Sequence, residues 1–269
     1  MRIVTFAAIK GGVGKTTLTY NFGEFLALKE NKKVLLVDFD HQCNLSQTYN
    51  VTDPEGTVGA IFTETGKVKV HQVDKNIDLL AGSMELDDIQ SALETKSRKE
   101  ERLLLWLTQN RDFLKEKNYD YILIDCHPDF GLATKNAVVV SDYIISPMAP
   151  GKYSFSSQWT ITARLEALKK ELVDYKTLES IVTAKLFFVT NLIRNTNSSK
   201  EFLETISKEE KAGDLICIGN FPEKELINKS TLDSEPISAM EQNKRILSQN
   251  KNFFTEINQT FRSIEQSLK

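Results

Sequence analysis

Glycine, lysine and threonine residues are concentrated in a short segment near the N-terminus. The segment reads KGGVGKTT over residues 10–17 and lies between an apolar stretch and a helical pattern. Gly11, Gly12 and Gly14 would let the backbone curl so that its N–H groups surround an anion, and the helix N-terminus would add partial positive charge. We therefore expect Lys15 to contact the β- and γ-phosphates of a bound nucleotide.

Two threonines follow this lysine directly. Mg²⁺ prefers oxygen ligands, and a hydroxyl at the first residue after the lysine is suited to bind the ion beside the phosphates. We expect Thr16 to supply that ligand and Thr17 to donate a hydrogen bond to the α-phosphate.

Aspartates end two apolar segments further along the chain. Asp38 and Asp40 belong to KVLLVDFD, and Asp125 belongs to YDYILIDC. Ligands bind at the carboxyl edge of a parallel sheet, where an acidic side chain can hold a magnesium-bound water or orient an attacking water. The three aspartates are accordingly candidates for a magnesium site, with contacts made through water.

Apolar strands and amphipathic helices alternate along the chain, and these elements would position the site. The expected strands are 2–8, 33–40, 76–82, 119–126, 142–148, 185–191 and 215–220. The expected helices are 15–29, 85–117, 154–172, 197–210 and 238–267. This alternation predicts an α/β fold with a mostly parallel, twisted sheet and helices on both faces. With no repeat and no linker found, we expect one domain over residues 1–269.

The composition excludes several classes of protein. The chain of 269 residues is 41% hydrophobic with a net charge of −3, so nothing global demands nucleic acid or an anionic membrane. Its three cysteines are far apart without a C-x-x-C pair, which argues against a zinc or iron–sulfur site and favours a reducing cytoplasm. The three histidines show no ligand spacing, so we expect no metal site built by histidines. The N-terminus opens into a strand rather than a secretion signal, and no apolar run is long enough to span a membrane.

The combined motifs resemble those of the ParA/MinD family of deviant Walker-A P-loop ATPases. The phosphate loop, DFDHQCNLS and YILIDCHPDFG carry the resemblance, which continues through SDYIISPMAP, FFVTNLI and FPEKELINKSTLDSEPI. Within the family, the chain is most similar to short ParA-type partition ATPases that have no N-terminal helix-turn-helix domain. The fold implied by the resemblance is that of a P-loop NTPase.

The resemblance also implies roles for individual residues. Lys10 is similar to the family's signature lysine, which crosses to the nucleotide of the partner subunit. Asp40 matches the aspartate that positions the hydrolytic water, and Asp38 lies near the metal. Catalytic roles are thus implied for Lys10, Lys15 and Asp40. The implied ATP contacts are Lys10, Gly11, Gly12, Val13, Gly14, Lys15, Thr16 and Thr17, with Asn191, Phe221, Pro222 and Glu223 at the adenine. The implied magnesium ligands are Thr16, Asp38, Asp40 and Asp125.

The implied function is that of a cytoplasmic, Mg²⁺-dependent ATPase with weak intrinsic activity. Such a protein forms a homodimer when ATP binds and drives plasmid or chromosome partition, and a ParB-like centromere-binding adaptor stimulates hydrolysis. DNA binding would place it on the nucleoid. One alternative is a MinD-like membrane-positioning ATPase, and another is a small-molecule ligase on the same fold. Reductase and iron–sulfur-carrier relatives need cluster cysteines that this chain lacks, and a bacterial tyrosine kinase needs a C-terminal tyrosine cluster that is absent.

The chain departs from the family pattern at two places. His41 and Cys43 replace the usual proline and glycine, which predicts a slightly different backbone for the loop after Asp40. Family arginines that serve non-specific DNA binding are replaced by Glu223, Lys224 and Glu225, which weakens the inference of DNA binding. Other basic residues could rebuild a basic face, but we favour a plain solvated surface for them. These residues are Lys224, Lys229, Lys244, Arg245 and Lys251.

The C-terminal segment NFFTEINQTFRSIEQSLK carries apolar residues at helical spacing. A membrane-targeting helix would need a basic polar face, but Glu256 and Glu265 balance Arg262 and Lys269. The pattern therefore favours core packing, and a membrane partner is not expected.

Overall fold

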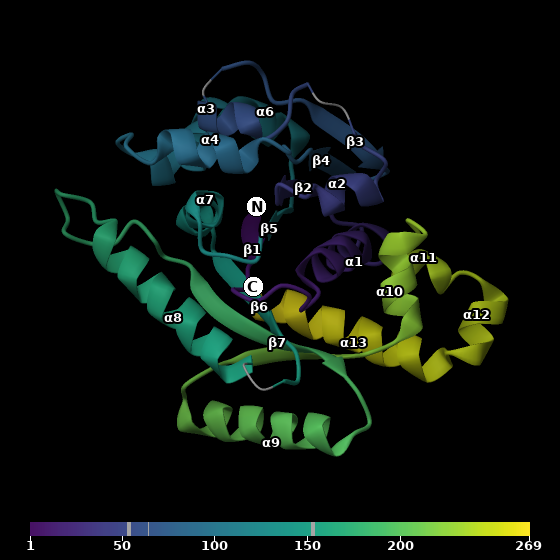
Figure 1. Ribbon diagram of the computed structural model, residues 1–269. Helices are drawn as coiled ribbons and strands as arrows, with labels where there is room; N and C mark the ends of the chain where they lie inside the picture. The colour runs from purple at the N-terminus through teal and green to yellow at the C-terminus, as the bar shows by residue number, and fades with distance from the viewer. Residues whose placement is uncertain (53–54, 64, 152–153) are drawn as a thin grey trace.

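The computed structural model describes residues 1–52, 55–63, 65–151 and 154–269. Within these residues, eight strands form one sheet in the order β3-β4-β2-β5-β1-β6-β7-β8 (Figure 1). Only the pairing of β3 with β4 is antiparallel. The strands are β1 (Arg2–Phe6), β2 (Val34–Phe39), β3 (Val70–Asp74), β4 (Ile77–Leu80), β5 (Tyr121–Cys126), β6 (Tyr143–Met148), β7 (Lys185–Ile193) and β8 (Cys217–Pro222). The expected α/β class with a mostly parallel sheet is confirmed.

Seven of these strands lie where the sequence predicts them, and β3 is the one that sequence analysis missed. Its sequence, VHQVD, is half polar, and its side chains are partly or fully exposed. A short polar edge strand carries little hydrophobic signal, so its pairing with β4 is decided by the neighbouring chain rather than by its own residues.

Helices cover both faces of the sheet and make two separate hydrophobic clusters with it. On one face, α1 (Lys15–Leu28), α2 (Asn44–Thr48), α10 (Glu225–Leu232), α11 (Ile237–Met240) and α13 (Lys251–Ser267) pack near alternating strand residues such as Phe6 and Leu36. The opposite cluster includes Leu35 and Ile124. Its helices are α3 (Gly59–Thr63), α4 (Leu86–Leu93), α5 (Arg102–Gln109), α6 (Arg111–Lys117), α7 (Leu132–Val140), α8 (Ser154–Glu171) and α9 (Asn197–Ala212). Because consecutive strand residues point to opposite faces, each central strand contributes to both clusters.

The two longest expected helices are wrong as continuous elements. Residues 85–117 form α4, the short 3-10 helix η1 (Lys99–Glu101), α5 and α6. Helix α4 ends at Leu93, and Arg98, directly before η1, adopts a left-handed conformation with φ of 55°, so no continuous helix can pass through it. The Leu103 backbone N–H then donates to Asn136 Oδ1 on α7, so a tertiary contact helps to set where α5 begins.

Residues 238–267 are likewise interrupted. They form part of α11, then α12 (Lys244–Gln249) and α13. The Asn243 side chain accepts hydrogen bonds from Arg245 N and Ile246 N, so it acts as the N-cap of α12. Helix periodicity alone does not reveal such caps inside an apolar pattern.

The apolar face of α13 is part of the core, as its sequence pattern predicts. Phe254 and Phe261 are almost fully buried, and the Phe261 ring lies 5.2 Å from the ring of Phe25 on α1. Among the described residues, no helix is both long and apolar enough to cross a bilayer.

Candidate nucleotide-binding site

The loop between β1 and α1 depends on glycine at two positions. Gly12 has φ of 72° and Gly14, the N-cap of α1, has φ of 89°, so both occupy the left-handed region that favours glycine. A Cβ at Gly14 would also overlap the side-chain amide of Asn191. Gly11 differs, since it has no positive φ and a Cβ there would meet Pro128 at an ordinary 3.8 Å. The curl of this loop therefore rests on two of the three glycines that the sequence singles out.

The first turn of α1 is joined to the end of β5. Thr16 Oγ1 donates to Asp125 Oδ2 at 2.6 Å, and Thr19 Oγ1 lies 3.4 Å from Asp125 Oδ1. Lys15 is only 6% exposed and its positive charge acts on Asp125. The residues expected to contact the phosphates and Mg²⁺ on β1–α1 and on β5 are thus brought together, and Thr19 is a member of this group that sequence analysis missed.

Two carboxylates lie side by side at this edge of the sheet. Asp38 on β2 and Asp125 on β5 are register partners, and both are fully buried. Burial, together with the nearby charge of Asp38, raises the pKa of Asp125 to about 8, although the hydrogen bond from Thr16 and the charge of Lys15 oppose the shift. Burial likewise raises the pKa of Asp38 to about 6, although hydrogen bonds from Ser46 oppose the shift. Both carboxylates are hard to ionise here unless a cation is added.

The donor set suits a magnesium ion. Thr16 supplies a hydroxyl and Asp125 supplies a carboxylate, which are hard oxygen ligands of the kind that Mg²⁺ prefers. A divalent cation would also stabilise the ionised form of the buried carboxylate pair, whose pKa values are raised in its absence. The residues present therefore fit the expected ion.

Asp38 is engaged by its own chain. Its Oδ2 accepts hydrogen bonds from both the backbone N–H and the hydroxyl of Ser46, at 2.9 and 2.7 Å, and its Oδ1 accepts from Asp40 N at 3.2 Å. The Ser46 hydroxyl in turn accepts from Gly82 N at the end of β4. Asp38 thus holds the loop after β2 in place, with Ser46 and Gly82 as positioning residues. Apart from the place of Ser46 in the motif DFDHQCNLS, nothing in the sequence marks these two residues as part of the site.

Asp40 begins the loop that connects β2 to α2. It is 4% exposed, and its Oδ1 accepts a hydrogen bond from Gln42 N at 2.9 Å. Cys43 follows with φ of 53°, a left-handed conformation that favours glycine. The cysteine adopts this left-handed turn although it carries a Cβ, and a loop backbone slightly different from that of the family stays a prediction.

The residues expected at the adenine are only partly grouped. Asn191 Nδ2 donates to Val13 O at 2.8 Å, which ties the end of β7 to the phosphate loop, while its Oδ1 has no hydrogen-bond partner among the described residues. The Phe221 ring is 1% exposed and packs against Phe261 in the core, and its contact with adenine stays a prediction. Pro222 and Glu223 remain partly exposed, and the Glu223 carboxylate pairs with Arg194.

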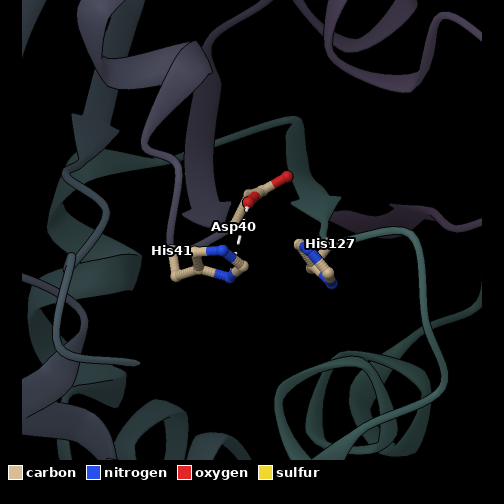
Figure 2. Close-up of side chains that lie close together, drawn as sticks. All are labelled: Asp40, His41 and His127. Atoms are coloured by element: carbon tan, nitrogen blue, oxygen red, sulfur yellow. Dashed lines mark ion pairs between the residues drawn. The ribbon is translucent and has the colours of Figure 1, made fainter. Parts of the chain in front are cut away.

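The two loops that follow β2 and β5 bring together residues that the sequence separates. His41 and His127 have ring centroids 4.4 Å apart, and both lie beside Asp40 (Figure 2). The expectation of no histidine-built metal site rested on spacing along the chain. Spacing along the chain does not reveal this group, because the parallel strands β2 and β5 end next to each other and bring together His41 and His127, which are 86 positions apart.

A glycine-rich loop that leads into a helix, together with a pair of acids at the carboxyl edge of a parallel sheet, defines the class of P-loop nucleotide-binding proteins. A family model described as an AAA domain matches residues 1–180. The sporulation initiation inhibitor protein Soj of Bacillus subtilis is 32% identical over 197 residues, which is 71% of this chain and 75% of Soj. The chain belongs to the ParA/MinD family of P-loop ATPases.

Comparisons with two further proteins agree with the assignment to this family. The virulence plasmid ParA family protein pGP5-D of Chlamydia psittaci is 30% identical over 158 residues, covering 57% of this chain and 59% of that protein, so the match spans less than two thirds of this relative. A plasmid partition protein of Borrelia burgdorferi, solved with bound AMPPNP, superposes with a TM-score of 0.76 at 22% identity. That superposition covers 99% of this chain and 98% of the other, and at this identity it shows the shared fold.

Proposed function

We propose that this protein is a Mg²⁺-dependent ATPase that dimerises when it binds ATP and uses this switch to move DNA cargo in plasmid or chromosome partition. The observation that carries the proposal is the joining of Thr16 to Asp125 beside a buried Lys15, which groups a phosphate-binding cation with magnesium ligands. The names of the relatives, a plasmid ParA family protein and Soj, support partition as the process.

The two lysines of the loop are suited to different tasks. Lys15 is buried at the start of α1, where it can contact the phosphates held by its own subunit. Lys10 is exposed on the same loop, so its ammonium group is available to a second molecule. In the proposal, Lys10 contacts the ATP of the partner subunit, and the loop therefore reports the presence of the γ-phosphate to the dimer interface.

Asp40 is the proposed positioning group for the attacking water. It lies at the carboxyl end of β2, next to the strand that carries Asp125, and it needs no proton transfer from a distant residue to act. Magnesium, when bound, would neutralise charge that develops on the phosphates. Thr16 and Asp125 would hold the ion, while Asp38 would keep the Asp40 loop in its conformation.

The proposed partner is a ParB-like adaptor that stimulates slow hydrolysis, as the family resemblance implies. DNA contact through the segment after Pro222 has little support, because Glu223 pairs with Arg194 and Glu225 pairs with Lys229. The exposed basic residues Lys244, Arg245 and Lys251 offer another route to DNA. A membrane-positioning role has no supporting observation, since the apolar face of α13 is used in the core.

Light scattering on the purified protein tests the dimerisation step. We expect a monomer without nucleotide or with ADP, a transient dimer with ATP, and a long-lived ATP dimer for Asp40→Ala. A wild-type protein that stays monomeric with a slowly hydrolysed ATP analogue would refute the switch. A DNA retention assay over a salt series, run with ADP, ATP or no nucleotide, then tests whether the dimer binds DNA.

A further inference from the structure

Asp40, His41 and His127 form a compact group of potential metal ligands. Asp40 and His41 begin the loop after β2, and His127 begins the loop after β5. One ligand atom from each of the three residues lies within 4.8 Å of the others, and His41 Nδ1 is 3.9 Å from Asp40 Oδ1 (Figure 2). Two imidazoles and a carboxylate together make a ligand set that is typical of transition-metal ions.

The spacing is close to that of a formed site. Tetrahedral ligands about 2.1 Å from a zinc ion lie about 3.4 Å from one another, so the three groups need to approach by roughly 1 Å. Both histidines stand in loops rather than in strands, and their side chains can approach by changing rotamer. Their side chains are 28% and 26% exposed, which leaves a path for an ion from solvent.

The imidazoles also have unmet hydrogen-bonding capacity. The Nδ1 atoms of His41 and His127 are buried and make no hydrogen bond within the described residues. A carboxylate oxygen lies 3.2 Å from each Nδ1, Asp87 Oδ2 beside His41 and Asp129 Oδ2 beside His127. A carboxylate that accepts from Nδ1 leaves Nε2 of the same imidazole as the nitrogen that binds the ion, and such a carboxylate raises the basicity of the metal-bound histidine.

We propose that Asp40, His41 and His127 bind one transition-metal ion of the zinc class, with Asp87 and Asp129 orienting the two imidazoles. The site shares no residue with Thr16 and Asp125, although the family resemblance also implies Asp40 for magnesium, and the two ions are distinguished by chemistry. Imidazole nitrogen favours Zn²⁺, whereas Mg²⁺ prefers an all-oxygen set and gives up its water reluctantly.

An ion at this position would connect two loops that flank the nucleotide site. It would join the start of the loop after β2 to the start of the loop after β5 and would engage the carboxylate of Asp40. This consequence rests on the proposed function, in which Asp40 positions the attacking water. A bound Zn²⁺ would then lower ATP hydrolysis, because Asp40 could no longer orient that water.

Zinc binding is measured on the untagged full chain without nucleotide, by competition with a chromophoric chelator. We expect about one Zn²⁺ per wild-type chain, retained when Mg²⁺ is present in large excess. His41→Ala and His127→Ala should each weaken binding by at least about tenfold. His71→Ala is the matched control, since His71 lies on the edge strand β3, and it should bind as the wild type does. Equal affinity in wild type, His41→Ala and His127→Ala would overturn the proposal.

Cobalt spectroscopy provides an independent readout. Co²⁺ bound by two imidazoles and a carboxylate should give a visible d–d absorption band that His41→Ala and His127→Ala lose and His71→Ala keeps. An absent band in the wild type, or one that survives in both variants, would count against the site. Circular dichroism confirms that the variants are folded, and because neither measurement includes ATP, the result stands apart from the test of dimerisation.

Hydrolysis assays test only whether a bound Zn²⁺ slows ATP hydrolysis by engaging Asp40. Zn²⁺ should slow ATP hydrolysis by the wild type and have a smaller effect on His127→Ala, both measured at saturating Mg²⁺. If the wild type binds Zn²⁺ but is not slowed, the metal site stands and its coupling to Asp40 is rejected.

Discussion

Thr16 donates its hydroxyl hydrogen to the carboxylate of Asp125 across 2.6 Å, which joins the first turn of α1 to the end of β5. This contact exists because β1 lies directly beside β5, with Phe6 and Asp125 in register, so the loop that leaves β1 passes over the end of its neighbour. A phosphate cradle and a magnesium-binding acid thereby become parts of one site. The contact also predicts the effect of a substitution at Asp125.

Asp125→Asn should weaken Mg²⁺-dependent nucleotide binding by at least about tenfold, because the ion loses an anionic partner while the side chain keeps its size. The nucleotide-free protein should not be destabilised at pH 8, since the change removes a buried charge that Asp38 opposes. Calorimetric titration with and without Mg²⁺ measures the first effect. Thr19→Val is the control, because Thr19 Oγ1 lies 3.4 Å from Asp125 and its loss should change Mg²⁺ dependence little. Unchanged Mg²⁺ dependence in Asp125→Asn would remove Asp125 from the site.

Substitution of the two lysines of the phosphate loop should have different effects on nucleotide binding and on dimerisation. Lys15→Ala should lower the nucleotide affinity of the monomer about 10- to 100-fold, as expected for the loss of charge-assisted hydrogen bonds. Lys10→Ala should leave that affinity within about threefold, because the exposed side chain is proposed to serve the partner subunit, yet it should abolish the ATP-dependent dimer. Fluorescence titration and light scattering on the same samples provide the two measurements. Equal loss of monomer affinity in both variants would contradict separate roles.

Gly14→Ala and Gly11→Ala should differ in stability although they lie three residues apart. Alanine at position 14 must adopt φ of 89° and would overlap Asn191, so we expect a loss of at least about 1–2 kcal/mol. Alanine at position 11 meets only Pro128 at 3.8 Å, and its effect should stay within about 0.5 kcal/mol. Denaturant unfolding without nucleotide compares the two directly. Similar losses in both variants would show that the curl depends on Gly11 as well.

Stability should fall with rising pH because of Glu24. Burial raises the pKa of this carboxyl to about 7 from an ordinary 4.5, and its only described hydrogen bond comes from the Tyr49 hydroxyl at 2.7 Å. The folded protein holds the proton more tightly than the unfolded chain. Its contribution is therefore fully present below pH 4.5 and is lost as pH rises through 7. Each pKa unit corresponds to about 1.4 kcal/mol, so the loss is roughly 3 kcal/mol.

Glu24→Gln should remove this part of the pH dependence, so that unfolding free energies of variant and wild type diverge between pH 5 and 8 in favour of the variant. Tyr49→Phe is the paired comparison. It deletes the hydrogen bond that favours the ionised carboxylate, and the pH dependence should become steeper rather than flatter. Parallel curves for wild type and Glu24→Gln would show that the carboxyl is not the titrating group.

Many local features were predicted correctly from the sequence, although the two longest expected helices are interrupted. Alternating apolar and amphipathic segments indicate β1, β2 and α1 because strand and helix periodicities are properties of contiguous residues. The buried face of α13 follows from its spacing for the same reason. The order of glycines, lysine and threonines likewise predicts the phosphate loop, since its conformation is largely a matter of consecutive backbone angles.

Other features depended on neighbours that are distant in sequence. The polar edge strand β3 pairs with β4 because of the adjacent chain, and the first turn of α5 is held by Asn136, which accepts the N–H of Leu103. Phe221 matches a family position near adenine but turns its ring to Phe261, because the core on that face has room for an aromatic side chain.

The amino-acid sequence by itself determined the kind of chemistry, since a phosphate loop and strand-terminal aspartates are readable from residue types and order. Which side chains share a site follows from the folded arrangement of the strands. Parallel strands bring together residues separated by a whole crossover, so Asp38 meets Asp125 and His41 meets His127 although neither pair shares a local pattern. Proximity of this kind is a property of sheet order, and sheet order is set by the packing of the whole chain rather than by any one segment.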